Sequence, residues 1–146
     1  MINIDAFVKE RGIKTELTTD TAIISITDSV RLKVSTNEGV HEVLGEIFVD
    51  GRPRIMAIDG YEMSLVPEGE MVMIQNDDQP GVIGMVGTIL GDHKVNIADF
   101  MLSRQKNKAL MTFKLDAPMP EPTLKALQAR KPPINLVLPV TLPPLG

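Results

Sequence analysis

Residues 76–91 read NDDQPGVIGMVGTILG, and the predicted architecture is built around this segment. Its first six residues are polar or turn-forming, which is typical of a loop. From Val82 to His93, Val, Met, Ile, Leu and His residues then recur at intervals of three and four, which predicts one buried face of a helix. The stretch therefore predicts a loop that runs directly into the N-terminus of a helix.

Strand patterns flank that helix on both sides. The predicted strands cover residues 71–74, 95–105, 109–115 and 134–142, and a second helix begins at residues 120–122. This order is β-α-β-β-α-β, the split arrangement of ferredoxin-like sandwiches, with both helices on one face of the sheet. Pro139 lacks an N–H to donate within the last strand, so we expect that strand at a sheet edge.

The chain before this region has a different pattern. Residues 67–70 combine a Pro, a Gly and two charges, so we expect one domain over residues 1–69 and a second over residues 70–146. Residues 3–11 predict a short helix, and the Thr-rich residues 18–27 fit either a strand or a loop. Apolar residues then alternate along four short segments separated by turn residues, which predicts a small, mostly antiparallel sheet. The expected fold class is α+β.

Composition excludes several kinds of function. The 146 residues carry a net charge of −4 and no Cys, which excludes disulfides, thiol catalysis and thiolate metal sites. Acidic residues outnumber basic ones, no apolar run is long enough to span a membrane, and the start lacks a signal peptide's pattern. His41 and His93 have no metal-ligand spacing. We therefore expect a cytoplasmic protein without a metal, nucleic-acid or membrane partner.

The loop before the helix has the chemistry of a small-molecule site. The first N–H groups of a helix are unpaired and lie at its positive end, so they can hold a carboxylate. Asp78 can hold an ammonium group, and Asn76 and Asn96 each offer a donor and an acceptor. This set suits a small zwitterionic amino acid. In the alternative interpretation, Asp78 and Asn76 only cap the helix and Asn96 lies in a turn.

Three glycines of the helix, Gly84, Gly87 and Gly91, share one side of it. They favour close approach of another backbone for at least two of them, or space for a ligand. The spacing Gly81-x-x-Gly84-x-x-Gly87 is wrong for a dinucleotide fingerprint, and a hairpin follows the helix in place of a second βα unit. Asp77 and Asp78 are adjacent, so their side chains are expected to point apart. We therefore predict no nucleotide site and no catalytic residue in this chain.

Two sets of residues carry a resemblance to a known family. Residues 76–91 together with VNIA at 95–98 resemble the ACT domain of D-3-phosphoglycerate dehydrogenases, over residues 71–142. The first part is similar to the second half of their intervening, or allosteric substrate-binding (ASB), domain. That similarity is carried by AFVKERGI at 6–13, GEIF at 45–48, PRI at 53–55 and IDGY at 58–61.

The resemblance implies a regulatory part of an enzyme of serine biosynthesis that is inhibited by its end product. L-Serine, or a similar small amino acid, would bind where the ACT domains of a homodimer meet. Arg54 would be the basic residue left at an ASB anion site. The implied serine contacts are Asn76, Asp78 and Asn96, with backbone groups of Gly81, Val82 and Ile83.

The resemblance also implies what lies outside this sequence. The NAD-binding catalytic domain would be a partner, so no catalytic residue and no cofactor are expected in these 146 residues. Two alternatives stay open. One is a regulatory or assembly subunit of another amino-acid enzyme, such as an iron–sulfur L-serine dehydratase. The other is a dimerisation module without a ligand.

Overall fold

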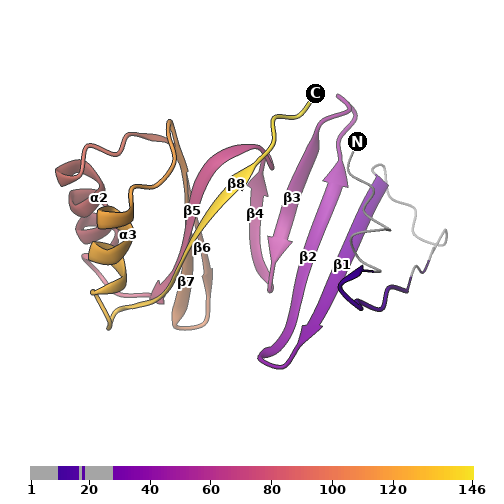
Figure 1. The fold of residues 1–146 in the computed structure, drawn as a ribbon, viewed down its shortest axis with the longest axis horizontal. Coiled ribbons are helices and arrows are strands. Elements are labelled where there is room, and N and C mark those ends of the chain that lie inside the picture. The colour runs from indigo at the N-terminus through magenta and orange to yellow at the C-terminus, as the bar shows by residue number, and fades with distance from the viewer. Residues whose placement is uncertain (1–9, 17, 19–27) are drawn as a thin grey trace.

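The computed structural model describes residues 10–16, 18 and 28–146. The predicted helix over residues 3–11 lies outside the described residues except for its last two, and the Thr-rich segment 18–27 except for Thr18. The described residues form an α+β fold of two four-stranded antiparallel sheets and two helices, as the sequence predicts (Figure 1). Both helices fall short of the length and hydropathy that a membrane-spanning helix needs.

The first sheet has the four strands that the sequence predicts, although the alternating apolar residues Val30, Leu32 and Val34 of its first strand are exposed. Its strands lie in chain order, each antiparallel to the next. Asp59 and Gly60 form the two-residue turn between the third and fourth strands, and both have positive φ angles, 50° and 81°, as a type I′ hairpin turn requires. The four strands are β1 (Asp28–Thr36), β2 (Gly39–Ile47), β3 (Pro53–Ile58) and β4 (Tyr61–Leu65).

The second sheet has the predicted β-α-β-β-α-β connection, and its strand order is β6-β7-β5-β8. Pro139 lies on β8, which among the described strands pairs only with β5 and so forms a sheet edge, as expected. Lys106, with φ 57°, begins the two-residue turn between β6 and β7. The elements are β5 (Gly69–Asp77), α2 (Val82–Asp92), β6 (Ile97–Gln105), β7 (Lys108–Leu115), α3 (Glu121–Gln128) and β8 (Ile134–Leu142).

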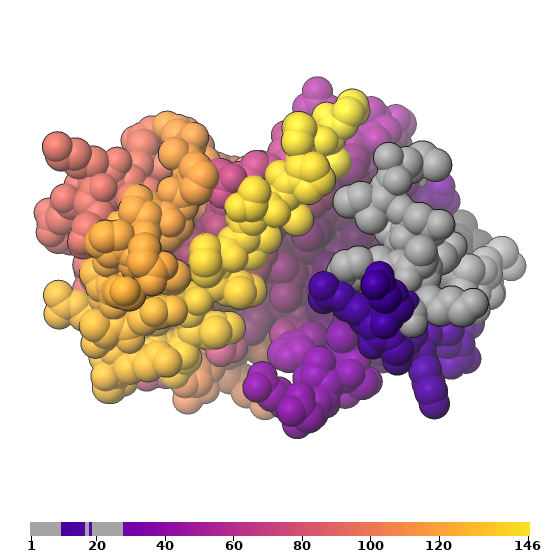
Figure 2. Space-filling view, viewed as in Figure 1, coloured from indigo at the N-terminus to yellow at the C-terminus, as the bar shows by residue number. Residues whose placement is uncertain are grey.

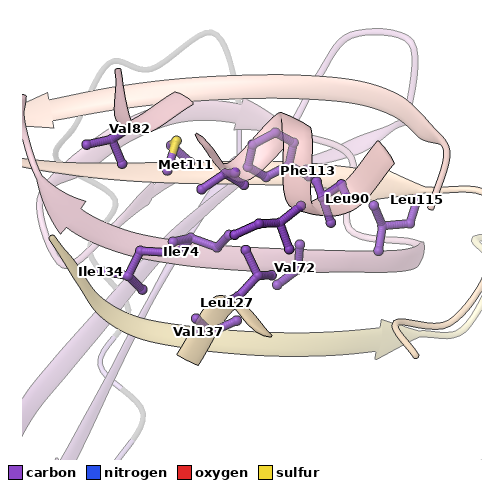
Figure 3. Packing of buried hydrophobic residues seen from close by; sticks show 12 residues of the cluster. Val72, Ile74, Val82, Leu90, Met111, Phe113, Leu115, Leu127, Ile134 and Val137 are labelled. Carbon is purple, nitrogen blue, oxygen red and sulfur yellow. The ribbon is translucent and has the colours of Figure 1, made fainter. Parts of the chain in front are cut away.

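The main hydrophobic core lies between the second sheet and its two helices. Alternate residues of β5, β7 and β8 point toward the helices, and each helix contributes its apolar stripe (Figure 3). Burial of this surface is the dominant stabilising contribution, and it holds the start of α2 against the strand ends. The labelled core residues are Val72, Ile74, Val82, Leu90, Met111, Phe113, Leu115, Leu127, Ile134 and Val137.

The first sheet meets the face of the second sheet opposite the helices through β4, which lies against β6, and its other strands extend away from there (Figure 1). Tyr61 and Leu65 of β4 are buried there. The Gln75 amide donates to the Tyr61 hydroxyl over 3.2 Å, and the Lys114 ammonium donates to the Val66 carbonyl over 3.3 Å. The C-terminal residues run obliquely across the molecule toward the first sheet in the space-filling view (Figure 2).

Candidate functional site

A hollow of about 320 Å³ lies where the loop after β5 meets the start of α2 and the neighbouring ends of β6 and β7. The strand order places these segments together, because β7 lies between β5 and β6. Five of the six residues predicted for effector binding line this hollow: Asn76, Asp78, Gly81, Val82 and Ile83.

The N-terminus of α2 opens toward the hollow without a side-chain cap. Gly81 is the N-cap residue, and its φ of 89° is a left-handed conformation that favours glycine. The first helical hydrogen bond joins the Met85 N–H to the Gly81 carbonyl over 2.9 Å. The N–H groups of Val82 and Ile83 therefore have no acceptor among the described residues. The capping interpretation of Asn76 and Asp78 is wrong, because neither side chain bonds to these groups.

Asn76 is a buried polar residue, with 3% of its surface exposed. Its Nδ2 donates to the Asp77 carbonyl over 2.7 Å. Because a carbonyl only accepts hydrogen bonds, this contact fixes the orientation of the amide. Its Oδ1 then has no hydrogen-bond partner among the described residues. Such an orphaned acceptor costs about 1–3 kcal/mol, so a donor supplied by a ligand would be stabilised here.

Asp78 forms an ion pair across the hollow. Its Oδ1 lies 3.3 Å from Nε of Arg104, a residue of β6 that the sequence analysis missed. Arg104 is placed by the register, since it lies opposite Ala109, which in turn lies opposite Asn76. The only signal in the sequence was its position near the end of a predicted strand. That signal identifies the residue only once the strand order is known.

Asp77 has a different role from its neighbour Asp78. Lys108 and Asn135 both donate to its carboxylate, the latter over 3.2 Å, so it ties the end of β5 to β7 and β8. The hydrogen bond from Lys108, followed by that from Asn135, lowers the pKa of Asp77 below its ordinary value of 3.8. The two adjacent carboxylates therefore contact different partners, Arg104 for Asp78 and Lys108 with Asn135 for Asp77.

This pKa shift predicts an acid-dependent loss of stability. Because the pKa is lower in the folded state, ionised Asp77 stabilises the fold fully above pH 3.8 and loses this effect as the pH falls through the folded value. The difference in free energy of unfolding between the wild type and Asp77→Asn should therefore be largest near neutral pH and shrink on acidification. Urea denaturation at a series of pH values measures it. A difference that stays constant into acid would contradict the assignment.

Two predicted residues lie away from the hollow. Asn96 precedes β6, roughly 25 Å along the strand from Arg104, and its side-chain amide donates to the Asp116 carboxylate. One chain therefore does not bring Asn96 to the site. Arg54 lies on β3 in the first sheet, with its guanidinium carbon 5.5 Å from the centre of the Phe48 ring. A role for Arg54 in binding an anion stays a prediction.

The helix glycines do not pack as expected. A Cβ atom built on Gly84, Gly87 or Gly91 would meet nothing within 4 Å, so the predicted close approach of another backbone is absent from the described residues. The reason is their position, since at 100° per residue they lie opposite the buried stripe of α2. This face of α2 is left open.

Comparisons with known proteins agree with these observations. Residues 1–59 match the family model of the D-3-phosphoglycerate dehydrogenase intervening domain, and residues 71–131 match that of the ACT domain. A D-3-phosphoglycerate dehydrogenase of Synechocystis is 31% identical over 128 residues, which are 86% of this chain and 23% of that protein. The corresponding enzyme of Methanocaldococcus jannaschii is 28% identical over 130 residues, 88% of this chain and 24% of the relative.

A relative of another kind also matches. The probable L-serine dehydratase beta chain of Bacillus subtilis is 23% identical over 108 residues, covering 73% of this chain and 49% of the relative. The chain spans about a quarter of the length of the two dehydrogenases named above. Because both family models match in order, the chain is similar to the region of D-3-phosphoglycerate dehydrogenases that joins an intervening-domain segment to an ACT domain.

Proposed function

We propose that this chain senses a small amino acid, with L-serine the first candidate, and mediates feedback inhibition of a D-3-phosphoglycerate dehydrogenase in the cytoplasm. The observation that carries the proposal is the hollow at the start of α2, where free N–H groups, a carboxylate and an orphaned acceptor converge. The family matches and the named dehydrogenases support the enzyme to which the regulation applies.

Each group of L-serine finds a complementary partner in the hollow. The N–H groups of Val82 and Ile83, at the positive end of α2, suit the carboxylate. The Asp78 carboxylate suits the ammonium group, and Asn76 Oδ1 suits the serine hydroxyl as donor. Glycine and alanine lack that hydroxyl, so they would leave the Asn76 acceptor unpaired.

A second copy of the chain would complete the site. The outer side of β6 pairs with no strand of the described residues, and Ile97 and Phe100 on it are 37% and 36% exposed. Antiparallel pairing of β6 with its copy about a two-fold axis would extend the sheet. It would also bring Asn96 of the second copy toward the end of β6 that carries Arg104. The open glycine face of α2 leaves further room for a homodimer.

The regulation would work through differential affinity. L-Serine that bridges two ACT domains favours the arrangement in which both halves of the site are in place. Coupling of this kind between sites is typically about 1–3 kcal/mol, and it cannot exceed the difference in the ligand's affinity for the two states. The activity of the catalytic dehydrogenase domain, which would bind NAD, would then depend on that arrangement. We propose no cofactor for these 146 residues.

Calorimetric titration of the chain with L-serine, L-alanine and glycine tests this function. We expect L-serine to bind most tightly and to raise the melting temperature, because a ligand at a hundred times its Kd stabilises the folded state by about 2.7 kcal/mol. Sedimentation should show a dimer. If no amino acid gives heat or a thermal shift at millimolar concentration, the sensing function fails and the chain is a dimerisation module.

The L-serine dehydratase beta chain supports a second candidate function, a regulatory or assembly subunit of such an enzyme. L-Serine would then be substrate as well as ligand, and the iron–sulfur cluster would belong to the partner subunit. Purification of the native protein that contains this chain distinguishes the two. NAD reduction with 3-phosphoglycerate supports the dehydrogenase, and deamination of L-serine supports the dehydratase.

A further inference from the structure

Three residues on neighbouring strands form a row across the floor of the hollow. Asn76 on β5 lies opposite Ala109 on β7, and Ala109 lies opposite Arg104 on β6. Directly opposite residues of antiparallel strands share a face of the sheet. This face is the helix side, because Ile74 and Met111, each two residues away along its strand, belong to the core under the helices.

Ala109 leaves space at the centre of the floor of the hollow. It is buried, and it is the only one of the three with a side chain as small as a methyl group. The two longer polar side chains therefore stand on either side of a gap. A small ligand above Ala109 would lie between the Asn76 amide and the Arg104 guanidinium.

The ion pair between Arg104 and Asp78 is arranged so that a ligand can replace it. Nε of Arg104 lies 3.3 Å from Oδ1 of Asp78, and the side chain of Arg104 is 65% exposed. Its two terminal nitrogens donate to no described residue. An exposed ion pair contributes little to stability, so its exchange for contacts with a ligand costs little. The planar guanidinium also matches the two oxygens of a carboxylate.

We propose that Arg104 binds the α-carboxylate of the effector, together with the N–H groups of α2, while Asp78 turns from Arg104 to the effector's ammonium group. The carboxylate of the ligand then faces the Arg104 guanidinium, and its ammonium group faces the Asp78 carboxylate. Because the ligand is a zwitterion, the net charge of the site does not change. Arg104 is thereby the residue through which the site prefers ligands with a free α-carboxylate. This inference rests on the proposed amino-acid sensing.

Titration with L-serine and with L-serinamide, in which an uncharged amide replaces the carboxylate, tests the inference. The wild type should prefer L-serine by about tenfold or more, since it loses a charge-assisted contact with the amide. In Arg104→Gln the affinity for L-serine should fall by about the same factor while that for L-serinamide changes little, so the preference collapses. Arg104→Lys should keep part of it.

Lys106→Gln serves as the matched control, because it removes the same charge from the adjacent turn without touching the hollow. It should leave both affinities unchanged. An equal preference for L-serine in the wild type and Arg104→Gln overturns the role of Arg104 while the sensing function stands. Failure of the wild type to bind any amino acid overturns the proposed function and this inference with it.

Discussion

Replacement of Asp78 by alanine is expected to weaken the binding of L-serine by about a hundredfold while the fold and the dimer persist. The variant removes the one carboxylate that lines the hollow among the described residues. The ammonium group of the ligand would lose a charge-assisted hydrogen bond, worth about 1.5–3 kcal/mol. Because 1.4 kcal/mol corresponds to a factor of ten in Kd, the upper part of this range accounts for about two orders of magnitude.

Asp77→Ala is the matched control for this variant. It removes a carboxylate from the adjacent position, but Asp77 bonds to Lys108 and Asn135 and does not line the hollow. It should lower stability and leave the affinity for L-serine within a few-fold of the wild type. Calorimetry at equal ligand concentrations compares the two, and sedimentation confirms the dimer. Unchanged binding in Asp78→Ala would show that the ammonium group is held elsewhere.

A heterodimer of Asp78→Ala with Asn96→Ala is expected to recover L-serine binding that both homodimers have lost. Each proposed site takes Asp78 from one chain and Asn96 from the other. In the heterodimer one site therefore lacks both side chains and the other lacks neither. Two affinity tags on co-expressed chains isolate this species, and titration should find about half of the wild-type number of sites, with wild-type affinity.

The control heterodimer pairs Asp78→Ala with the double variant Asp78→Ala/Asn96→Ala. Neither of its sites is intact, so it should bind no L-serine although it passes through the same two-tag purification. Absence of binding in the first heterodimer would contradict a site shared between chains. Strong binding by the Asn96→Ala homodimer would contradict it as well, because Asn96 would then contribute nothing.

The fold could be predicted from local patterns because the apolar residues of each segment repeat with the period of a strand or of a helix. Alternation over residues 134–142 predicted β8, and Pro139 within it predicted an edge, since the missing N–H is tolerated only there. The loop before α2 could be identified for the same reason, because its polar and turn residues precede a helical stripe directly. Five of the predicted site residues are near one another in sequence, which is why they also share one hollow.

The glycines of α2 show where local reasoning failed. Glycine destabilises a helix relative to alanine, which suggested that a close neighbour requires these glycines. No described residue outside the helix lies within 4 Å of a Cβ atom built on any of them. Asn96 shows a second limit. The sequence pattern placed it at the start of a strand, but only the direction of β6 revealed that this start lies far from the hollow within one chain.

Periodicity and turn chemistry are properties of neighbouring residues, so the elements, their order and the polar loop at the start of α2 could be predicted without a structure. The position of β7 between β5 and β6 follows instead from long-range packing, and it brings Arg104 beside Asp78 across 26 positions of chain. The same packing leaves Asn76 with an oxygen that has no partner among the described residues. Both results depend on strand register and burial, which arise from contacts between residues distant in the sequence.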